Sequence, residues 1–188
     1  AYFADMQLDL LDVRARELVP NILQSLKSQP QHERLETAIK LLADWDYVAT
    51  TDSKAACIFY PLLEKRLHIQ FMETVLGKSP LITTMSSIAP ALNRFDISHF
   101  MAEGSPWRAH RDTLDKIIAD NVIAIVEYLT TNYADDWSWG KIHQIRFGHS
   151  LRKHKPWQAI HVGPDPIGGS ATTLRMAQHN PPAKGSIE

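Results

Sequence analysis

The stretch from Asp112 to Thr130 constrains the fold of this 188-residue chain more than any other segment. Its apolar residues recur at spacings of three, four and seven, and charged residues lie between them. The apolar positions are Leu114, Ile117, Ile118, Ile125 and Leu129. This pattern is typical of an amphipathic helix, because residues at those spacings share one face of a helix. Such a helix has to bury its apolar face against other elements of the chain.

Two further helices are expected before Trp45. A stripe of residues at helical spacing predicts a first helix that Pro20 bends or ends, because proline has no amide hydrogen to donate. The stripe consists of Met6, Leu10, Val13 and Glu17. The second helix spans residues 31–44, and Trp45 is expected to close its end against the core. Its apolar face consists of Leu35, Ala38, Ile39 and Leu42.

A third helix is predicted to begin near Asp52 and Ser53 and to run to Gly77. Either side chain can accept the free amide hydrogens of a first helical turn. Gly77 followed by Pro80 is a stop signal, because glycine tolerates a left-handed cap and proline cannot continue a helix. Residues 78–110 are less regular, and a short helix is expected there at residues 88–94.

The chain changes character after Asn132, where glycines become frequent. Residues 141–147 alternate enough to predict a strand, with a helical turn as the alternative. Residues 172–178 are predicted to form a second strand, and the segment 164–172, rich in proline and glycine, is expected to be a loop. The fold class is therefore mainly α with a small β-containing C-terminal part (α+β). A helical body, 1–135, and a strand and loop end, 136–188, are expected to pack as one unit.

Charge and composition exclude several classes of function. A net charge of -1 provides no long-range field to recruit nucleic acid or an anionic membrane, so neither partner is expected. No run approaches the ~18 apolar residues of a membrane span, and no signal peptide is recognisable. Cys57 lies in an apolar stretch and is expected to be a packed hydrophobe. The chain starts without Met and has no evident stop, so both ends are expected to be cut from something longer.

Residues that could bind a ligand do not form recognisable sites. The histidines match no compact zinc pattern, and the aspartates lack the glycine turn and the terminal glutamate of an EF-hand. The histidines are His143, His149, His154 and His161, and the aspartates are Asp44, Asp46 and Asp52. Gly168-Gly169 could suggest a phosphate-binding loop, but the pair has no strand before it, no helix after it and no lysine following it in the sequence pattern. The basic and aromatic residues Arg146, Arg152, Lys153, Lys155 and Trp157 are expected to be a solvated face. The sequence therefore assigns no metal or cofactor.

One run of residues is distinctive. Trp137-Ser138-Trp139-Gly140 is followed by His143 and His149, and then by a loop from Pro164 to Thr172 that contains Gly168-Gly169-Ser170. The bulk of the tryptophans favours a role in the core. His143 is expected to be partly buried, with its ring hydrogen-bonded to backbone near the Trp-Gly turn.

The order and spacing of this run resemble the late β-chain region of the penicillin acylase (penicillin amidase) family. In that family a Trp-x-Trp-Gly-x-x-His segment leads to a second His and then to a Pro-rich, Gly-Gly loop ending in Thr. Earlier segments resemble the family in the same order. They are Met6–Asp9, Arg14-Ala15, Leu18-x-Pro20, Leu41–Asp46, Asp52–Ala56 and Trp107. Together these matches extend over nearly the whole chain.

The resemblance implies a piece of an αββα N-terminal-nucleophile amidohydrolase, whose precursor cuts itself to expose Ser, Thr or Cys at the start of the β chain. Ala1 has no hydroxyl. The pairs Gly104-Ser105, Gly169-Ser170 and Gly185-Ser186 lack the Asn that follows the family's nucleophile. No catalytic residue is therefore assigned, and this chain alone is expected to be inactive.

The expected work of the chain is structural, namely to buttress the catalytic sheet and to shape one wall or entrance of the acyl pocket. Its partner would be the rest of the parent acylase, with an N-acyl amide as the parent's substrate. Calcium is possible in the parent, and a periplasmic or secreted location is suggested for it. The alternative is a stand-alone helical module whose Trp-rich end binds a protein.

Overall fold

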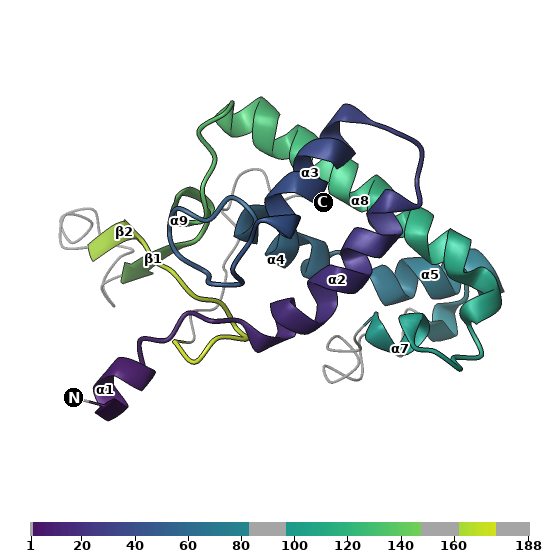
Figure 1. The fold of residues 1–188 in the computed structure, drawn as a ribbon, viewed down its shortest axis with the longest axis horizontal. Helices are drawn as coiled ribbons and strands as arrows, with labels where there is room; N and C mark the ends of the chain where they lie inside the picture. Colours follow the sequence, from purple (N-terminus) through teal and green to yellow (C-terminus); the bar gives the residue numbers. More distant parts are fainter. Residues whose placement is uncertain (1, 83–96, 148–161, 176–188) are drawn as a thin grey trace.

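A computed structural model of the chain describes residues 2–82, 97–147 and 162–175, and Figure 1 shows the arrangement of its helices and strands. The described part is mainly helical and ends in a small antiparallel sheet, as the sequence predicts. In chain order the elements are α1 (Tyr2–Met6), α2 (Val13–Lys27), α3 (Glu33–Ala43), α4 (Ala56–Glu64), α5 (Leu67–Leu76), α7 (Ser98–Met101), η2 (Arg108–His110), α8 (Arg111–Tyr133), α9 (Trp139–Ile142), β1 (Gln144–Phe147) and β2 (Val162–Pro166).

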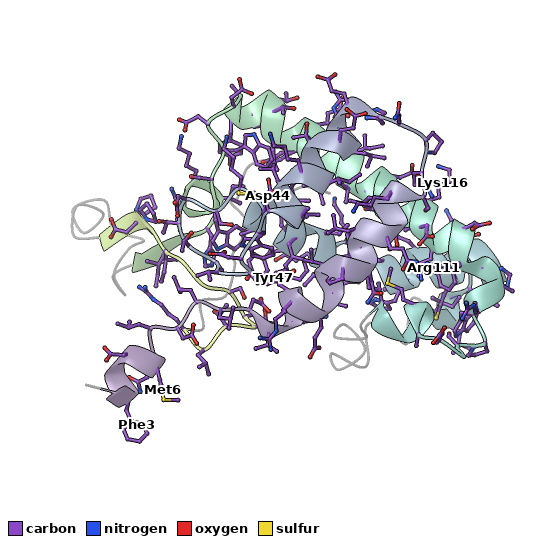
Figure 2. All side chains as sticks on the ribbon, in the orientation of Figure 1. Phe3, Met6, Asp44, Tyr47, Arg111 and Lys116 are labelled. Atoms are coloured by element: carbon purple, nitrogen blue, oxygen red, sulfur yellow. The ribbon has the colours of Figure 1, made fainter. Side chains whose placement is uncertain are left out.

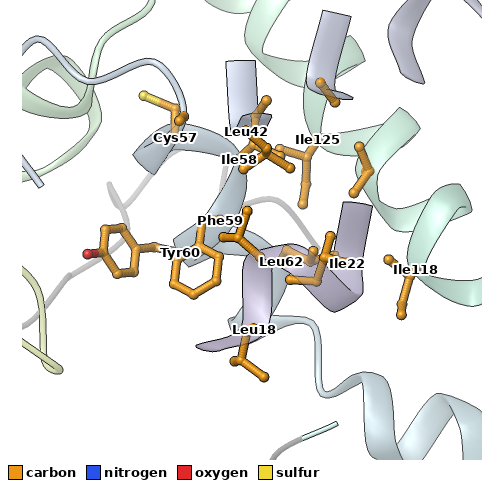
Figure 3. Close-up of a cluster of buried hydrophobic side chains, with 14 of the residues drawn as sticks. Leu18, Ile22, Leu42, Cys57, Ile58, Phe59, Tyr60, Leu62, Ile118 and Ile125 are labelled. Atoms are coloured by element: carbon orange, nitrogen blue, oxygen red, sulfur yellow. The ribbon is translucent and has the colours of Figure 1, made fainter. Parts of the chain in front are cut away.

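Helix α8 is the element against which the other long helices pack. Helices α2, α3, α4 and α5 all contact it, as Figure 1 shows. The predicted helix at residues 112–130 is confirmed, and its buried residues include Leu114, Ile118, Ile125 and Leu129. Figure 3 shows Ile118 and Ile125 of α8 facing apolar residues of α2 and α4. Burial of these side chains supplies most of the driving force for packing the helices.

The predicted first helix is wrong in its position. Met6 and Val13 are exposed, and α2 instead begins after Asp12 and continues through Pro20 to Lys27. Its buried face consists of Ala15, Leu18, Val19, Ile22, Ser25 and Leu26. Proline is tolerated here because Pro20 and Arg16 both lie on the exposed side of the helix. Pro20 has no amide hydrogen to donate to the Arg16 carbonyl, and water can donate to that carbonyl instead.

The second predicted helix is confirmed as α3, with Leu35, Ala38 and Leu42 buried. Trp45 follows it and is buried against the core, as expected. Its ring lies 5.5 Å from that of Phe59, and its indole Nε1 donates to the Val48 carbonyl at 3.0 Å. The end of α3 is therefore anchored by both apolar contact and a hydrogen bond.

The third predicted helix is divided into two. Ser53 provides the predicted acceptor, because the Ala56 amide donates to its hydroxyl at 3.2 Å. Helix α4 stops at Glu64, and α5 starts after Arg66, whose φ of 49° and ψ of 47° are left-handed. That conformation cannot belong to a continuous right-handed helix. Helix α5 ends at Gly77, as predicted.

The segment 78–110 contains α7 and η2, whereas the helix predicted at residues 88–94 lies outside the described residues. Trp107 is partly buried and packs edge-on against the rings of Phe71 and Phe100, at 5.8 Å from each. This aromatic group joins α5, α7 and the approach to α8.

Both interpretations of residues 141–147 hold in part, since the helical turn α9 ends at Ile142 and β1 begins at Gln144. The second strand is not where it was predicted. Strand β2 lies at Val162–Pro166, overlapping the predicted loop at residues 164–166, and pairs antiparallel with β1 through Gln144 opposite Pro166. Residues 172–175 form turns and bends. The rest of that predicted strand lies outside the described residues.

Residues 172–175 of the predicted strand form no strand because the threonines use their hydroxyl groups locally. The Thr173 hydroxyl donates to the Arg175 carbonyl at 2.7 Å, and the Thr172 amide donates to the Ser170 hydroxyl at 3.0 Å. Such side-chain bonds offer the backbone an alternative to a strand ladder. Strand β2 tolerates its prolines because, in the described part of the chain, it pairs with another strand on one side only. Among the described residues, no helix combines the length and apolar character needed to cross a membrane.

Candidate functional site

The carboxylate of Asp12 is the centre of a largely buried polar cluster that reaches the surface at Thr172. Asp12 is fully buried, and its Oδ1 accepts a hydrogen bond from the Ala15 amide at 3.0 Å, which caps α2. Its Oδ2 accepts from the Tyr60 hydroxyl at 2.9 Å and from the hydroxyls of Ser170 and Thr172. We call Asp12, Tyr60, Ser170 and Thr172 the Asp12 cluster. It joins the start of α2, the middle of α4 and the C-terminal loop.

Tyr60 connects the apolar core to this cluster. Figure 3 shows its hydroxyl directed away from the buried side chains of α2 and α8. Burial raises the pKa of the Tyr60 phenol above its ordinary value, so the group stays protonated and remains a donor to Asp12. The Tyr60 ring lies 4.8 Å from that of Trp139.

Trp139 contacts both Tyr60 and the C-terminal loop. It is fully buried, and its indole Nε1 donates to the Gly169 carbonyl at 2.9 Å. The His143 ring stacks on it at 4.6 Å, and His143 Nδ1 lies 2.8 Å from the Ile167 carbonyl. His143 is therefore a buried histidine bonded to backbone, as expected, although the backbone belongs to the loop and not to the Trp-Gly turn.

The glycines of the distinctive run are required by close packing. A Cβ at Gly169 would lie 2.3 Å from the Arg175 carbonyl oxygen, and φ there is 88°. A Cβ at Gly140 would lie 2.9 Å from side-chain atoms of both Thr51 and Pro166. Backbones can approach so closely only where no side chain intervenes. Protein atoms thus occupy the space beside Gly168 and Gly169, which leaves no room there for a phosphate.

Backbone hydrogen bonds hold four distant segments together beside the cluster. The Ala49 amide donates to the Leu10 carbonyl at 2.9 Å, and the Gly169 amide donates to the Ala49 carbonyl at 2.8 Å. The Gly140 amide donates to the Thr51 carbonyl at 2.6 Å. The Trp-Asp, Asp-Ser-x-Ala-Ala, Trp-x-Trp-Gly and Gly-Gly segments therefore meet around Tyr60 and Trp139.

A family comparison gives this convergence its context. The model of the penicillin amidase family matches residues 1–186. The chain belongs to the penicillin amidase family. In direct comparison, no curated protein matches it. Several of the segments that carried the resemblance to penicillin amidases meet around the Asp12 cluster, whereas Trp107 packs on Phe71 and Phe100 between α5 and α7.

The Asp12 cluster of this penicillin amidase chain is built to hold segments together. A serine nucleophile needs a general base within about 2.6–3.2 Å and access to substrate. The Ser170 hydroxyl instead faces Thr172 Oγ1 at 2.9 Å and Asp12 Oδ2 at 3.4 Å, which compete for its single hydrogen, and the residue is 4% exposed. Four donor groups lie within hydrogen-bond distance of the Asp12 carboxylate, three of them at Oδ2. Ser105 lies in a loop, where its hydroxyl accepts from the Trp107 amide, and Ser186 is outside the described residues.

Sequence reasoning missed Asp12 and Tyr60. Asp12 has the residue type of a helix N-cap, but the incorrect position of the first helix concealed that signal. Tyr60 lies in an apolar run that resembles any core helix. Cys57 is buried, and burial raises the pKa of its thiol to about 12, which confirms the packed-hydrophobe prediction.

The other candidate ligands have local roles where they are described. Asp46 Oδ1 accepts from the Val48 amide at 3.0 Å, and a hydrogen bond with the Thr50 side chain holds the pKa of the Asp52 carboxyl below its ordinary value. Within the described ranges, no group of three His, Cys, Asp or Glu side chains is arranged to hold a metal. His149, His154, His161 and residues 152–157 of the basic patch lie outside them.

Proposed function

We propose that this chain is the helical and late-strand part of an acylase, and that its work is to support the catalytic sheet and to shape one wall of the acyl pocket. The observation that carries the proposal is the convergence of several of the family's motifs on a largely buried, hydrogen-bonded cluster, in which Asp12, Tyr60 and Ser170 are buried and Thr172 lies at the surface. Such a cluster gives the region one rigid arrangement, because a satisfied buried network resists rearrangement. Rigidity is what a supporting wall has to provide.

The parent enzyme, on this proposal, hydrolyses N-acyl amides through an N-terminal serine. The free α-amine of that serine accepts the hydroxyl proton, and the oxygen attacks the amide carbonyl to form an acyl-enzyme that water then cleaves. Donors aimed at the developing oxyanion supply much of the stabilisation. Candidate substrates are penicillins, cephalosporins and acyl-homoserine lactones. The nucleophile and the oxyanion donors would lie in the partner portion of the acylase, with periplasmic or secreted location and calcium binding belonging to the whole enzyme.

Two features of the surface support a partner for this chain. Strands β1 and β2 form a two-stranded sheet in the described residues, so each offers an outer edge to further strands. Phe3, Leu8 and Leu174 are 78%, 59% and 65% exposed. The Arg175 amide donates to the Asp9 carbonyl, which brings the segment of Leu174 beside that of Leu8. Clustered exposed apolar residues are typical of contact surfaces.

The experiment is mass spectrometry with N-terminal sequencing on the product of the full reading frame that contains this segment. Two chains are expected, the larger beginning with Ser, Thr or Cys and containing residues 1–188 internally. Hydrolysis of a chromogenic N-acyl amide should require that serine and be absent from the 188-residue chain. A single unprocessed product without amidase activity would contradict the proposal and favour a helical protein-binding module, to which the exposed apolar residues are equally suited.

A further inference from the structure

A pocket of about 560 Å³ lies between the second half of α2, α7 and the start of α8. It is separate from the Asp12 cluster, which lies at the opposite end of α2. Figure 2 shows Arg111 in the first turn of α8, on the side of the molecule that carries α5 and α7. The volume falls in the range of pockets that bind small molecules.

The base of the pocket is an oriented guanidinium group. Arg111 Nε donates to Asp115 Oδ1 at 2.6 Å, and Arg111 Nη2 donates to the Ser25 hydroxyl at 3.3 Å. The Asp115 side chain is 8% exposed, whereas Arg111 is 24% exposed. The Ser28 hydroxyl donates to the Ser25 carbonyl at 2.8 Å and lies 3.4 Å from Asp115 Oδ2. Arginine has five N–H donors. The remaining three have no partner among the described residues, so Arg111 is fixed in place with donors to spare.

The other lining groups add donors and an apolar wall. Phe100 and Met101 of α7 line one side. Gln24 of α2 lines another, and within the described ranges its amide group has no hydrogen-bond partner. Arg108 stands at the rim, where Glu103 lies 3.9 Å from it and is 94% exposed. An ion pair so exposed contributes little, so Arg108 is readily recruited by a ligand.

The balance of charge selects the class of ligand. The lining contains two arginines and two carboxylates, so its formal net charge is zero. A lining without net positive charge cannot compensate a doubly charged anion. The Asp115 carboxylate is 8% exposed and already paired with Arg111 at 2.6 Å, so it offers little to a cation. The unused groups are mainly donors, and the planar fork of arginine matches a carboxylate.

We propose that this pocket binds a small monocarboxylate that carries a short apolar chain. The carboxylate accepts from the free N–H groups of Arg111, with Arg108 and the Gln24 amide beside it. The apolar chain packs on Met101, beside the largely buried edge of Phe100. This inference does not depend on the proposed acylase function, since it concerns residues outside the Asp12 cluster and requires no nucleophile.

The test is a titration of the isotopically labelled 188-residue chain with hexanoate, followed by NMR. Binding should shift the side-chain amide signals of Gln24 and Asn21 and the methyl signal of Met101. Hexanol and hexylammonium serve as matched probes without the negative charge and should bind at least about ten-fold more weakly, because a charge-assisted hydrogen bond is lost. Equal binding of hexanol, or no shift with hexanoate, would overturn the proposal.

Two variants locate the interaction. Replacing Arg111 alone would strand the buried Asp115 charge and endanger folding, so the pair is changed together as Arg111→Gln with Asp115→Asn. This double variant should unfold as cooperatively as the wild type and bind hexanoate at least about ten-fold more weakly. Arg16→Gln removes an exposed arginine of α2 that does not line the pocket and should leave binding unchanged. Undiminished binding by the double variant, or equal losses in both variants, would show that the carboxylate is not held by Arg111.

Discussion

The Tyr60 hydroxyl donates to the Asp12 carboxylate at 2.9 Å, across 48 positions of sequence, with both groups buried. This bond connects the N-cap of α2 to the middle of α4. The same Asp12 oxygen accepts from Ser170 and Thr172, so the N-terminal segment, a core helix and the C-terminal loop share one acceptor. The stability of the whole region should therefore depend on a few polar groups.

Removing that donor should destabilise the protein. Tyr60→Phe leaves the aromatic packing on Trp139 but removes a hydrogen bond to a buried charged group, so the free energy of unfolding should fall by about 1.5–3 kcal/mol. Urea denaturation measures this change. Tyr47→Phe is the control, since that residue is only partly buried, and it should change stability by less than about 0.5 kcal/mol. Equal effects of the two changes would exclude a special role for the Asp12 bond.

Trp139 should behave as a core anchor. Trp139→Ala removes a fully buried ring, together with its contacts to Tyr60 and His143 and its bond to the Gly169 carbonyl. The expected loss is about 3–5 kcal/mol of unfolding free energy in chemical denaturation. Leu81→Ala, at a position 67% exposed, should have little effect. A loss near zero for Trp139→Ala would mean that the ring is on the surface and available to a partner.

Gly169 and Gly104 form a matched pair, with φ values of 88° and 85°. Alanine at Gly104 meets no atom within 4 Å, so it should cost only the conformational strain of about 1 kcal/mol. Alanine at Gly169 meets the Arg175 carbonyl oxygen and should cost about 1–3 kcal/mol more. Thermal unfolding of both variants gives the difference directly. If the two losses agree, close packing of the loop is not what requires glycine.

Pro20→Ala should stabilise the chain. Alanine restores an amide donor to the Arg16 carbonyl inside α2. The helical gain of about 3 kcal/mol is reduced by the greater freedom of the unfolded chain and by water already bound at this exposed site, so a net gain of about 1–2 kcal/mol is expected. Urea denaturation checks the gain against Arg16→Ala, an exposed change in the same helix. A loss of stability would show that the proline ring packs favourably where it is.

Alkaline pH should destabilise the fold through Cys57. Burial raises the pKa of this thiol from 9.0 to about 12, so above about pH 9 the unfolded chain loses a proton that the folded chain keeps. The contribution is fully present below the unfolded value and is lost as the pH rises towards the folded value. Unfolding free energies measured from about pH 8 to 10 should fall more steeply in the wild type than in Cys57→Ala. Parallel slopes would place the thiol in contact with solvent.

The sequence was sufficient for those elements whose stability depends on a pattern within one helix. Helices α3 and α8 were predicted because their apolar residues recur on one face, and Gly77 was predicted as a helix end because of its conformational freedom. The position of α2 was not predictable in this way. Whether Pro20 ends a helix depends on which side of the helix faces water, and that is decided by what packs on Leu18 and Ile22.

The residues in and around the Asp12 cluster also differ in how far the sequence could identify them. The sequence by itself marked Trp139, His143 and Gly169 as unusual and indicated the penicillin amidase family. Only the tertiary structure decided that they meet Asp12 and Tyr60, because hydrogen bonds between distant segments leave no periodic trace in the sequence. The positions of the strands were also decided by the tertiary structure, because β2 forms only by pairing with β1. Residues 172 and 173 form no strand, because the Thr172 hydroxyl donates to Asp12 and the Thr173 hydroxyl donates to the Arg175 carbonyl.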